Sequence, residues 1–429
     1  MNPPPQASFA SVPFPRVFRV AILLEVLERL AFYGVYINLT VYVTETVHLT
    51  DAENGLLMAI FAGTRAWLPV ATGPLSDRIG FRKSLLWSFA LYIAAYASLF
   101  AFPSRLGAWC AVLGMAFAGA FLKPVIPATV RRYSPEGRHA TGFSIFYASV
   151  NAGSVVGKTG AKWVRTALSL RASMLNSVVA SAIALIIAFT MFFEPKTSKE
   201  EEPAEGTKGE GPFRSAPSIP TPPPPTFLQS LALAGRDPKF VAFLVLVSGY
   251  YLLIEQFYQT FPVYILRQLG DKAPREYITL INPLAIATLQ LLFTRITRKL
   301  PPVFAMTLGI FIGACSMLLM GLFPSLFGAC MSFFVFAVAE MVFSPRYYEY
   351  VSSFAPKGRE GLYAGLGFVP VGLGGIAGGF LSGGLIGKYL PKGGPLHPLP
   401  VWGTYALIGV ACAFSIGVFG LVTRKRTPR

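Results

Sequence analysis

Twelve apolar runs of about 20 residues, separated by Gly, Pro or charged residues, constrain this chain more than any other feature of its sequence. A helix of about 20 apolar residues is long enough to cross the hydrocarbon core of a bilayer. The runs lie near residues 18–45, 55–74, 84–103, 106–130, 140–164 and 172–193, and near 240–268, 277–294, 302–323, 326–345, 363–389 and 402–423. The sequence therefore predicts an all-α membrane protein with twelve transmembrane helices.

The composition supports a membrane protein. Only 13% of the 429 residues are charged and 53% are hydrophobic, whereas soluble proteins carry about 25% charged residues. A net charge of +17 could indicate a nucleic-acid partner, but the basic residues cluster at the ends of the apolar runs, where membrane proteins keep their topology signals. We therefore expect a lipid bilayer around this protein and no nucleic acid bound to it.

The order of the runs divides the chain into two halves. Residues 194–238 are acidic and then Pro-rich, a composition that cannot bury a core. The predicted organisation is an N-terminal tail (1–17), a six-helix bundle (18–193), a flexible linker (194–238), a second six-helix bundle (239–423) and a basic tail (424–429). If the N-terminus is cytoplasmic, the inner flanks hold twice as many basic residues as the outer flanks. Both tails and the linker are therefore expected in the cytoplasm.

The segment between the second and third runs reads "GPLSDRIGFRK", residues 73–83. Its glycines would allow a tight turn, and Asp77 and the basic cluster would pair with the ends of neighbouring helices. An ordinary basic loop would explain the positive charges but not the ordered glycines and aspartate. The segment resembles the motif G-x-L-x-D-R-x-G-x-(R/K)-(R/K) of the major facilitator superfamily. The resemblance implies that superfamily's fold and a cytoplasmic gate made by Gly73, Asp77, Arg78, Gly80, Arg82 and Lys83.

The first run contains Glu25, Glu28 and Arg29 within "LLEVLERLAFYGVYINL". Each charge near the middle of a bilayer costs roughly 2.5–3.5 kcal/mol on insertion scales. On a helix these three residues share one face with Phe32 and Tyr36, so that face is expected to point into the bundle. Glu25 and Arg29 would neutralise each other at a spacing of four residues. That pairing leaves one carboxylate for a proton or for a cation on another helix.

Other runs also carry charges at membrane depth. Arg65, Lys123 and Lys158 lie in the first half, whereas Glu255 and Glu340 lie in the second. A carboxylate paired with Lys123 would form a proton switch, because protonating the carboxylate releases the lysine. A cavity between a cationic half and an anionic half would suit a zwitterionic solute, with its carboxylate near the cations and its amine near Glu255 or Glu340.

Six short motifs resemble the proton-dependent oligopeptide transporter family, also called the peptide/nitrate transporter family. They are "EVLERLAFY" (25–33), Lys123-Pro124, "FYASVNAG" (146–153), Glu255-Gln256, Asn282-Pro283, and "EMVFSP" (340–345) with "APK" (355–357). The resemblance implies proton-coupled uptake of small peptides or related zwitterionic or anionic solutes by alternating access. No cofactor, metal or enzymatic activity is expected, because no nucleophile–base or metal-ligand spacing accompanies the three histidines.

The candidate site residues come from these motifs, from the charged face of the first helix and from the charges at depth. The resemblance assigns proton coupling to Glu25, Glu28, Arg29 and Lys123. The candidate substrate-binding residues are Arg29, Tyr33, Tyr36, Arg65, Lys123, Tyr147, Asn151, Glu255, Gln256, Asn282 and Glu340. Glu340 would hold the peptide amine, and Glu255 would bind substrate or form a salt bridge between the halves.

The sequence also departs from the family. Arg65 lies near a position where the family has a pocket aromatic residue, Lys158 stands where it has a proline, and "GLGF" (365–368) lacks its tryptophan. These changes favour a more anionic ligand than an ordinary peptide. An exporter or exchanger of an amphiphilic or anionic solute therefore stays open, whereas a non-transporting sensor would need the linker as its output. We expect a monomer in the plasma membrane, or in the inner membrane of a bacterium.

Overall fold

The computed structural model describes residues 13–136, 138–193, 235, 237–354, 363 and 365–423. Every regular element in these ranges is a helix. Most of the predicted linker, the tails before residue 13 and after residue 423, and the "APK" motif lie outside the described residues. The predicted domain boundaries within those segments therefore stay predictions.

Seven helical segments form the first half of the chain. They are α1 (Arg16–Val41), the π-helical segment η2 (Tyr42–Thr46), α2 (Asp51–Ile79), α3 (Phe81–Ala101), α4 (Arg105–Tyr133), α5 (His139–Ala167) and α6 (Ser173–Met191). Local sequence sets several of their ends. Thr50 and Glu53 form a reciprocal capping box at the start of α2, which satisfies backbone N–H groups that the first helical turn leaves free.

Eight helices lie among the described residues of the second half. They are α8 (Pro238–Gln259), α9 (Phe261–Leu269), α10 (Arg275–Ile278), α11 (Ile281–Thr297), α12 (Pro302–Leu322), α13 (Leu326–Ser353), α15 (Val369–Tyr389) and α16 (Pro398–Thr423). The predicted run 240–268 is interrupted between α8 and α9. Pro262 cannot donate to the carbonyl of Tyr258, and the Thr40 hydroxyl lies 3.5 Å from that oxygen instead.

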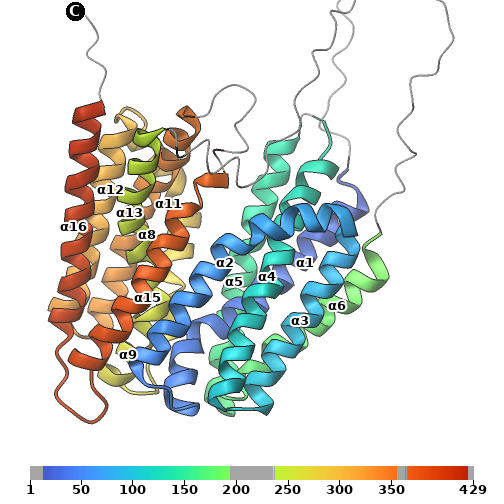
Figure 1. The fold of residues 1–429 in the computed structure, drawn as a ribbon, viewed down its shortest axis with the longest axis horizontal. Coiled ribbons are helices and arrows are strands. Elements are labelled where there is room, and N and C mark those ends of the chain that lie inside the picture. Colours follow the sequence, from blue (N-terminus) through green and yellow to red (C-terminus); the bar gives the residue numbers. More distant parts are fainter. Residues whose placement is uncertain are drawn as a thin grey trace, which may run out of the picture.

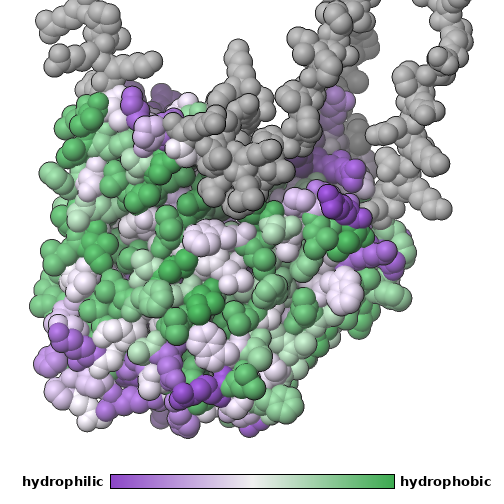
Figure 2. Space-filling model, viewed as in Figure 1, coloured by the Kyte–Doolittle hydropathy of each residue, from purple (hydrophilic) through white to green (hydrophobic). Residues whose placement is uncertain are grey.

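The outer surface of the molecule suits a bilayer. Ten helices among the described residues are long and apolar enough to cross a membrane. α1 and α5 have 26 and 29 residues but carry ionisable side chains and fall outside that set, so the count of twelve spans stays a prediction. Figure 2 shows apolar residues over the middle of one face, with hydrophilic residues gathered toward its lower edge and its upper right.

The two halves form separate bundles with separate cores. One hydrophobic cluster is built almost entirely by residues of α1–α6, and a second mainly by residues of α8–α16. Figure 1 shows the bundles converging at one end of the molecule and diverging toward the end where the C-terminus lies. We call these the convergent and the divergent end.

α2 and α15 pack against each other across the two halves, and glycines lie at several of their contacts. A Cβ placed on Gly379 of α15 would lie 2.5 Å from the backbone N of Ala59, and one on Gly55 of α2 would lie 2.5 Å from the backbone O of Gly379. Contacts this short allow no side chain, so glycine is required where the two backbones meet.

Gly379→Ala is therefore expected to destabilise the protein by about 1–3 kcal/mol, the usual cost of overpacking. Gly384→Ala is the matched control, because a Cβ on this glycine of the same helix meets no atom within 4 Å. Melting temperatures of the detergent-purified variants test the difference. Equal melting temperatures for the two variants would contradict the close contact.

Candidate functional site

A charged cluster on α1 lies inside the first bundle. Glu25 and Glu28 are 1% and 2% exposed, and Nε of Arg29 lies 2.7 Å from Oε1 of Glu25 and 2.9 Å from Oε2 of Glu28. The Tyr92 hydroxyl of α3 donates to Oε1 of Glu28 at 2.7 Å. Arg29 thus contacts both carboxylates, and the cluster carries one excess negative charge when both are ionised.

A second ion pair crosses between the halves. Nη2 of Arg65 on α2 lies 2.8 Å from Oε1 of Glu255 on α8, and the Tyr36 hydroxyl donates to the other carboxylate oxygen at 2.8 Å. The Arg65 guanidinium also lies 5.7 Å from the Phe32 ring centroid and 5.5 Å from that of Tyr36. Arg65 therefore binds the carboxylate of the other half and lies among aromatic rings of the first half.

The Lys123 ammonium contacts a different partner from the carboxylate that the sequence suggested. Its ammonium donates to the backbone O of Arg65 at 3.2 Å and forms no ion pair with any carboxylate of the described residues. The physical reason is Pro69, which lacks an N–H for the carbonyl four residues earlier and leaves the Arg65 oxygen free inside α2. The role of Lys123 as a partner of the coupling carboxylates therefore stays a prediction.

Prolines in other helices of the site have the same effect on a backbone carbonyl. A proline frees the carbonyl oxygen four residues before it, and a side chain from another helix then donates to that oxygen. Besides Lys123, the donors are Thr72 to Ala120 O at 2.5 Å, Lys158 to Thr279 O at 3.3 Å and Gln290 to Met341 O at 3.2 Å. The prolines of α4, α11 and α13 thus provide acceptors inside the bundles.

In the second half, Glu340 of α13 accepts a hydrogen bond from Nδ2 of Asn282 at 3.1 Å. Among the described residues it has no cationic partner. Gln256, in contrast, does not reach the site. It is fully buried, accepts from Thr260 at 2.6 Å and donates to the backbone O of Leu252. Its amide supports the break between α8 and α9, and its role in substrate binding stays a prediction.

Three aromatic residues lie between the ion pairs. The rings of Tyr36 and Tyr258 are stacked, with centroids 4.7 Å apart, and the Tyr33 ring lies 6.1 Å from that of Tyr258. Tyr258 was not among the predicted residues. Its sequence signals are its position three residues after Glu255 and four residues before Pro262, which place it on the face of Glu255 at the end of α8.

Tyr147 and Asn151 lie on α5 toward the divergent end. Tyr147 is 62% exposed. Nδ2 of Asn151 donates to the backbone O of Tyr147 at 3.1 Å, so its amide is engaged within its own helix.

Lys158 of α5 crosses into the second half and is 1% exposed. Its ammonium lies 3.3 Å from the backbone O of Thr279, 3.5 Å from the Tyr258 hydroxyl, and 5.2 and 5.5 Å from the ring centroids of Tyr33 and Tyr258. A desolvated ion costs several kcal/mol, whereas a cation–π contact returns about 0.5–2 kcal/mol. The neutral partners of Lys158 therefore do not offset the cost of burying its charge, as a carboxylate would.

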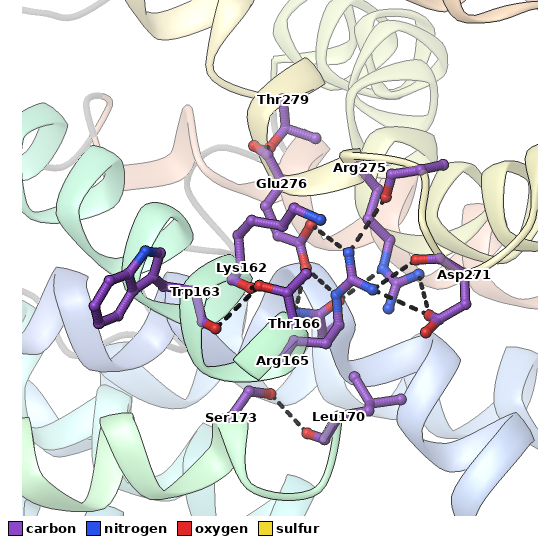
Figure 3. A network of polar contacts seen from close by, with 12 residues as sticks. Lys162, Trp163, Arg165, Thr166, Leu170, Ser173, Asp271, Arg275, Glu276 and Thr279 are labelled. Carbon is purple, nitrogen blue, oxygen red and sulfur yellow. Dashed lines mark hydrogen bonds and ion pairs between the residues drawn. The ribbon is translucent and has the colours of Figure 1, made fainter. Parts of the chain in front are cut away.

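A network of charges joins the halves at the convergent end (Figure 3). Arg165 of α5 lies 2.7 Å from Glu276 of α10 and 3.1 Å from Asp271. Asn38 of α1 accepts from Arg275 at 2.7 Å and donates to Glu276 at 3.1 Å. We call these five residues the convergent-end network. Arg165 and Arg275 are only 5% and 0% exposed, so this part of the network is buried between the halves.

Two more ion pairs connect the halves nearby. Arg267 of α9 binds Asp51 of α2 with two contacts of 2.7 and 3.0 Å. Lys392 lies 3.1 Å from Glu45 and donates to the backbone O of Thr44 at 2.8 Å. The convergent end is therefore held by several charged contacts between elements of different halves.

The predicted gate motif forms the corner between α2 and α3. Gly80 has φ +89°, a conformation that glycine adopts without steric cost. Arg82 donates to the backbone O of Phe189 near the end of α6 at 2.7 Å, which is the kind of contact expected for this motif. Asp77, Arg78 and Lys83 are exposed, and Asp77 forms no ion pair within the described part of the chain.

Fold and site define a helical membrane protein built from two bundles, with ionisable side chains collected between them. The Major Facilitator Superfamily model matches residues 21–379. The chain therefore belongs to the Major Facilitator Superfamily and is an integral membrane protein, and the predicted fold class is confirmed.

Two curated relatives illustrate the range of similar proteins. The chain is 25% identical over 190 residues to the dipeptide and tripeptide permease A of Yersinia pestis, an alignment that covers 43% of this chain and 38% of the permease. It is 24% identical over 360 residues to multidrug resistance protein MdtH of Aeromonas salmonicida (strain A449), with 82% of each chain covered.

Solved structures share the fold. A POT family transporter in complex with 5-aminolevulinic acid superposes with a TM-score of 0.74 at 18% identity, covering 98% of this chain and 100% of that chain. The nucleoside transporter NupG gives a TM-score of 0.76 at 16% identity, covering 94% and 99%. The resemblance predicted from the six motifs is thus confirmed as a similarity to peptide permeases and POT family transporters.

Proposed function

We propose that this protein is a secondary transporter that imports small peptides or related zwitterionic solutes together with protons. The observation that carries the proposal is the buried cluster of Glu25, Glu28 and Arg29 beside the Arg65–Glu255 pair between the halves. Ionisable residues inside a membrane are costly and mark substrate or proton pathways. The similarity to a dipeptide and tripeptide permease supports peptides as the substrate class.

The arrangement of the halves supports alternating access. Charged contacts join the halves from the Arg65–Glu255 pair to the convergent end, while the bundles diverge at the other end. A solute would enter from the divergent side in this conformation, and the opposite conformation would require the convergent-end network to separate. Secondary transporters work by such rocking of one half against the other.

We further propose that the divergent end faces the cytoplasm, with both tails and the linker on that side, because basic residues are concentrated on those flanks. The proposed location is the plasma membrane, or the inner membrane of a bacterium, and the proposed working unit is a monomer in lipid. The partners are the solute and protons, and no enzymatic reaction is part of the proposal.

Uptake into proteoliposomes tests the proposal. A pH gradient, acidic outside, is expected to drive accumulation of labelled dialanine, and Glu28→Gln is expected to abolish the dependence on the gradient because the glutamine cannot take up a proton. Glu53→Gln is the control, since Glu53 lies at the start of α2 and pairs with the exposed Arg105. Uptake that ignores the gradient in the unmodified protein would refute proton coupling.

A second candidate is a proton-driven exporter of amphiphilic compounds. It is favoured by the alignment to a multidrug resistance protein, which covers much more of the chain than the permease alignment does. The same proteoliposomes separate the two functions. An exporter would move a fluorescent amphiphilic cation against the proton flow and would leave labelled dialanine outside.

A further inference from the structure

Lys158 is a buried cation that the proposed coupling mechanism does not use. It lies seven residues after Asn151 and seven before Arg165 on α5, so the three share one face of that helix. That face runs from the aromatic residues of the site to the convergent-end network. Lys158 is the member of this face whose charge has only neutral partners among the described residues.

The backbone around Lys158 is fixed. A Cβ on Gly157 would lie 2.3 Å from the backbone O of Leu30, and a Cβ on Gly153 would lie 2.5 Å from that of Val26. α5 therefore packs directly on α1 one residue before the lysine. The ammonium is held between the rings of Tyr33 and Tyr258, so a partner has to come to it.

The charges between the halves can be paired off. Arg65 pairs with Glu255, and Arg29 pairs with both carboxylates of α1. Under the proposed function one of these two carboxylates carries the coupled proton, which makes the α1 cluster neutral. Lys123, Lys158 and Glu340 are then left without ionic partners among the described residues, a net charge of one positive unit.

A ligand that neutralises these three residues has two acidic groups and one amine. Thr279, whose backbone O contacts Lys158, and Asn282, whose amide contacts Glu340, are three residues apart. Thr279 lies in the turn before α11 and Asn282 in the first turn of α11, so the two unpaired charges flank one short segment of chain. An acidic dipeptide carries the matching groups, two carboxylates and one amine.

We propose that Lys158 is the specificity residue for an acidic side chain of the substrate, so that the protein prefers dipeptides containing Asp or Glu. This inference rests on the proposed function. The side-chain carboxylate replaces the Thr279 carbonyl and the Tyr258 hydroxyl as the partner of Lys158, while the peptide amine binds Glu340. A charge-assisted hydrogen bond replaces weaker neutral ones.

Proton-driven uptake of Ala-Glu and of its neutral isostere Ala-Gln tests the proposal. For the unmodified protein the Michaelis constant of Ala-Glu is expected to be about tenfold lower, the difference that one charge-assisted hydrogen bond provides. Lys158→Gln is expected to bring the ratio of the two constants close to one, and Lys158→Arg to keep most of it. Lys388→Gln is the matched control, because Lys388 also lies over a tyrosine ring but is exposed.

The outcomes separate the two proposals. Equal Michaelis constants for Ala-Glu and Ala-Gln in the unmodified protein, with uptake still driven by protons, would overturn the role of Lys158 and leave the proposed function standing. No uptake of either dipeptide would overturn both. If Lys158→Gln fails to fold, the ratio in the unmodified protein and in Lys158→Arg decides, and a ratio near one in either contradicts the inference.

Discussion

Arg165→Met is expected to open the convergent end. Arg165 is buried against Glu276 and Asp271, and removing one partner of a buried ion pair costs about 3–5 kcal/mol because the other charge is left unpaired. The conformation in which the buried Glu276 carboxylate reaches water then gains population. In a background without the four native cysteines, a cysteine at Ala273, which is 7% exposed, should react with a hydrophilic maleimide at least tenfold faster.

Arg105→Met is the matched control for this experiment. Arg105 lies 2.6 Å from Glu53, but the pair is 64% and 30% exposed and joins two helices of the same half. Exposed ion pairs contribute about 0–1 kcal/mol, so the labelling rate should stay unchanged. If Arg165→Met labels no faster than this control, the convergent-end network does not hold the halves together.

Arg29→Met is expected to destabilise the protein strongly at neutral or higher pH. Glu25 and Glu28 are then buried next to each other without a cation, and uncompensated buried charges cost about 3–5 kcal/mol. Lowering the pH should reduce the loss, because protonation removes the charges and their repulsion. Melting temperatures measured between about pH 5 and pH 8, relative to the unmodified protein, test this pH dependence.

The triple variant Glu25→Gln, Glu28→Gln and Arg29→Met provides the control, because it removes the cation and both anions together. Replacing all members of a buried ionic group is often nearly neutral for stability. The triple variant should therefore melt above Arg29→Met at pH 8. A melting temperature for Arg29→Met that equals that of the unmodified protein at pH 8 would show that the two carboxylates do not depend on Arg29.

The features that depend on neighbouring residues in the sequence could be predicted, namely the helices, the charged face of α1 and one turn. Hydrophobic runs located the helices, because an apolar run that is long enough to cross the bilayer core indicates a membrane-spanning helix. The charged face of α1 followed from helical spacing alone, and Arg29 does contact both glutamates. Gly80 was recognisable as a turn because its motif places a glycine between two helices.

Contacts that depend on how helices dock were not predictable in the same way. Arg165 and Glu276 are 111 residues apart, and nothing in either segment identifies the other. Tyr258 reaches the site because Pro262 ends α8 and because Tyr36 of the other half lies against its ring. Gln256 shares a motif with Glu255, but its amide bonds to Leu252 and Thr260 of its own segment, which the motif did not indicate.

The glycine contact between α2 and α15 involves a long helix, so a small rotation at the contact moves the far end of that helix by several ångströms. α2 has 29 residues, which makes it about 43 Å long at 1.5 Å per residue. A tilt of roughly 10° about one end of a helix of this length moves the other end by about 7 Å. This displacement exceeds the width of an extended chain, for which the spacing of about 4.8 Å between neighbouring strands in a sheet gives the scale. Under the proposed function, a small rotation at this contact would change the opening between the halves while Gly55 and Gly379 keep the two backbones in contact.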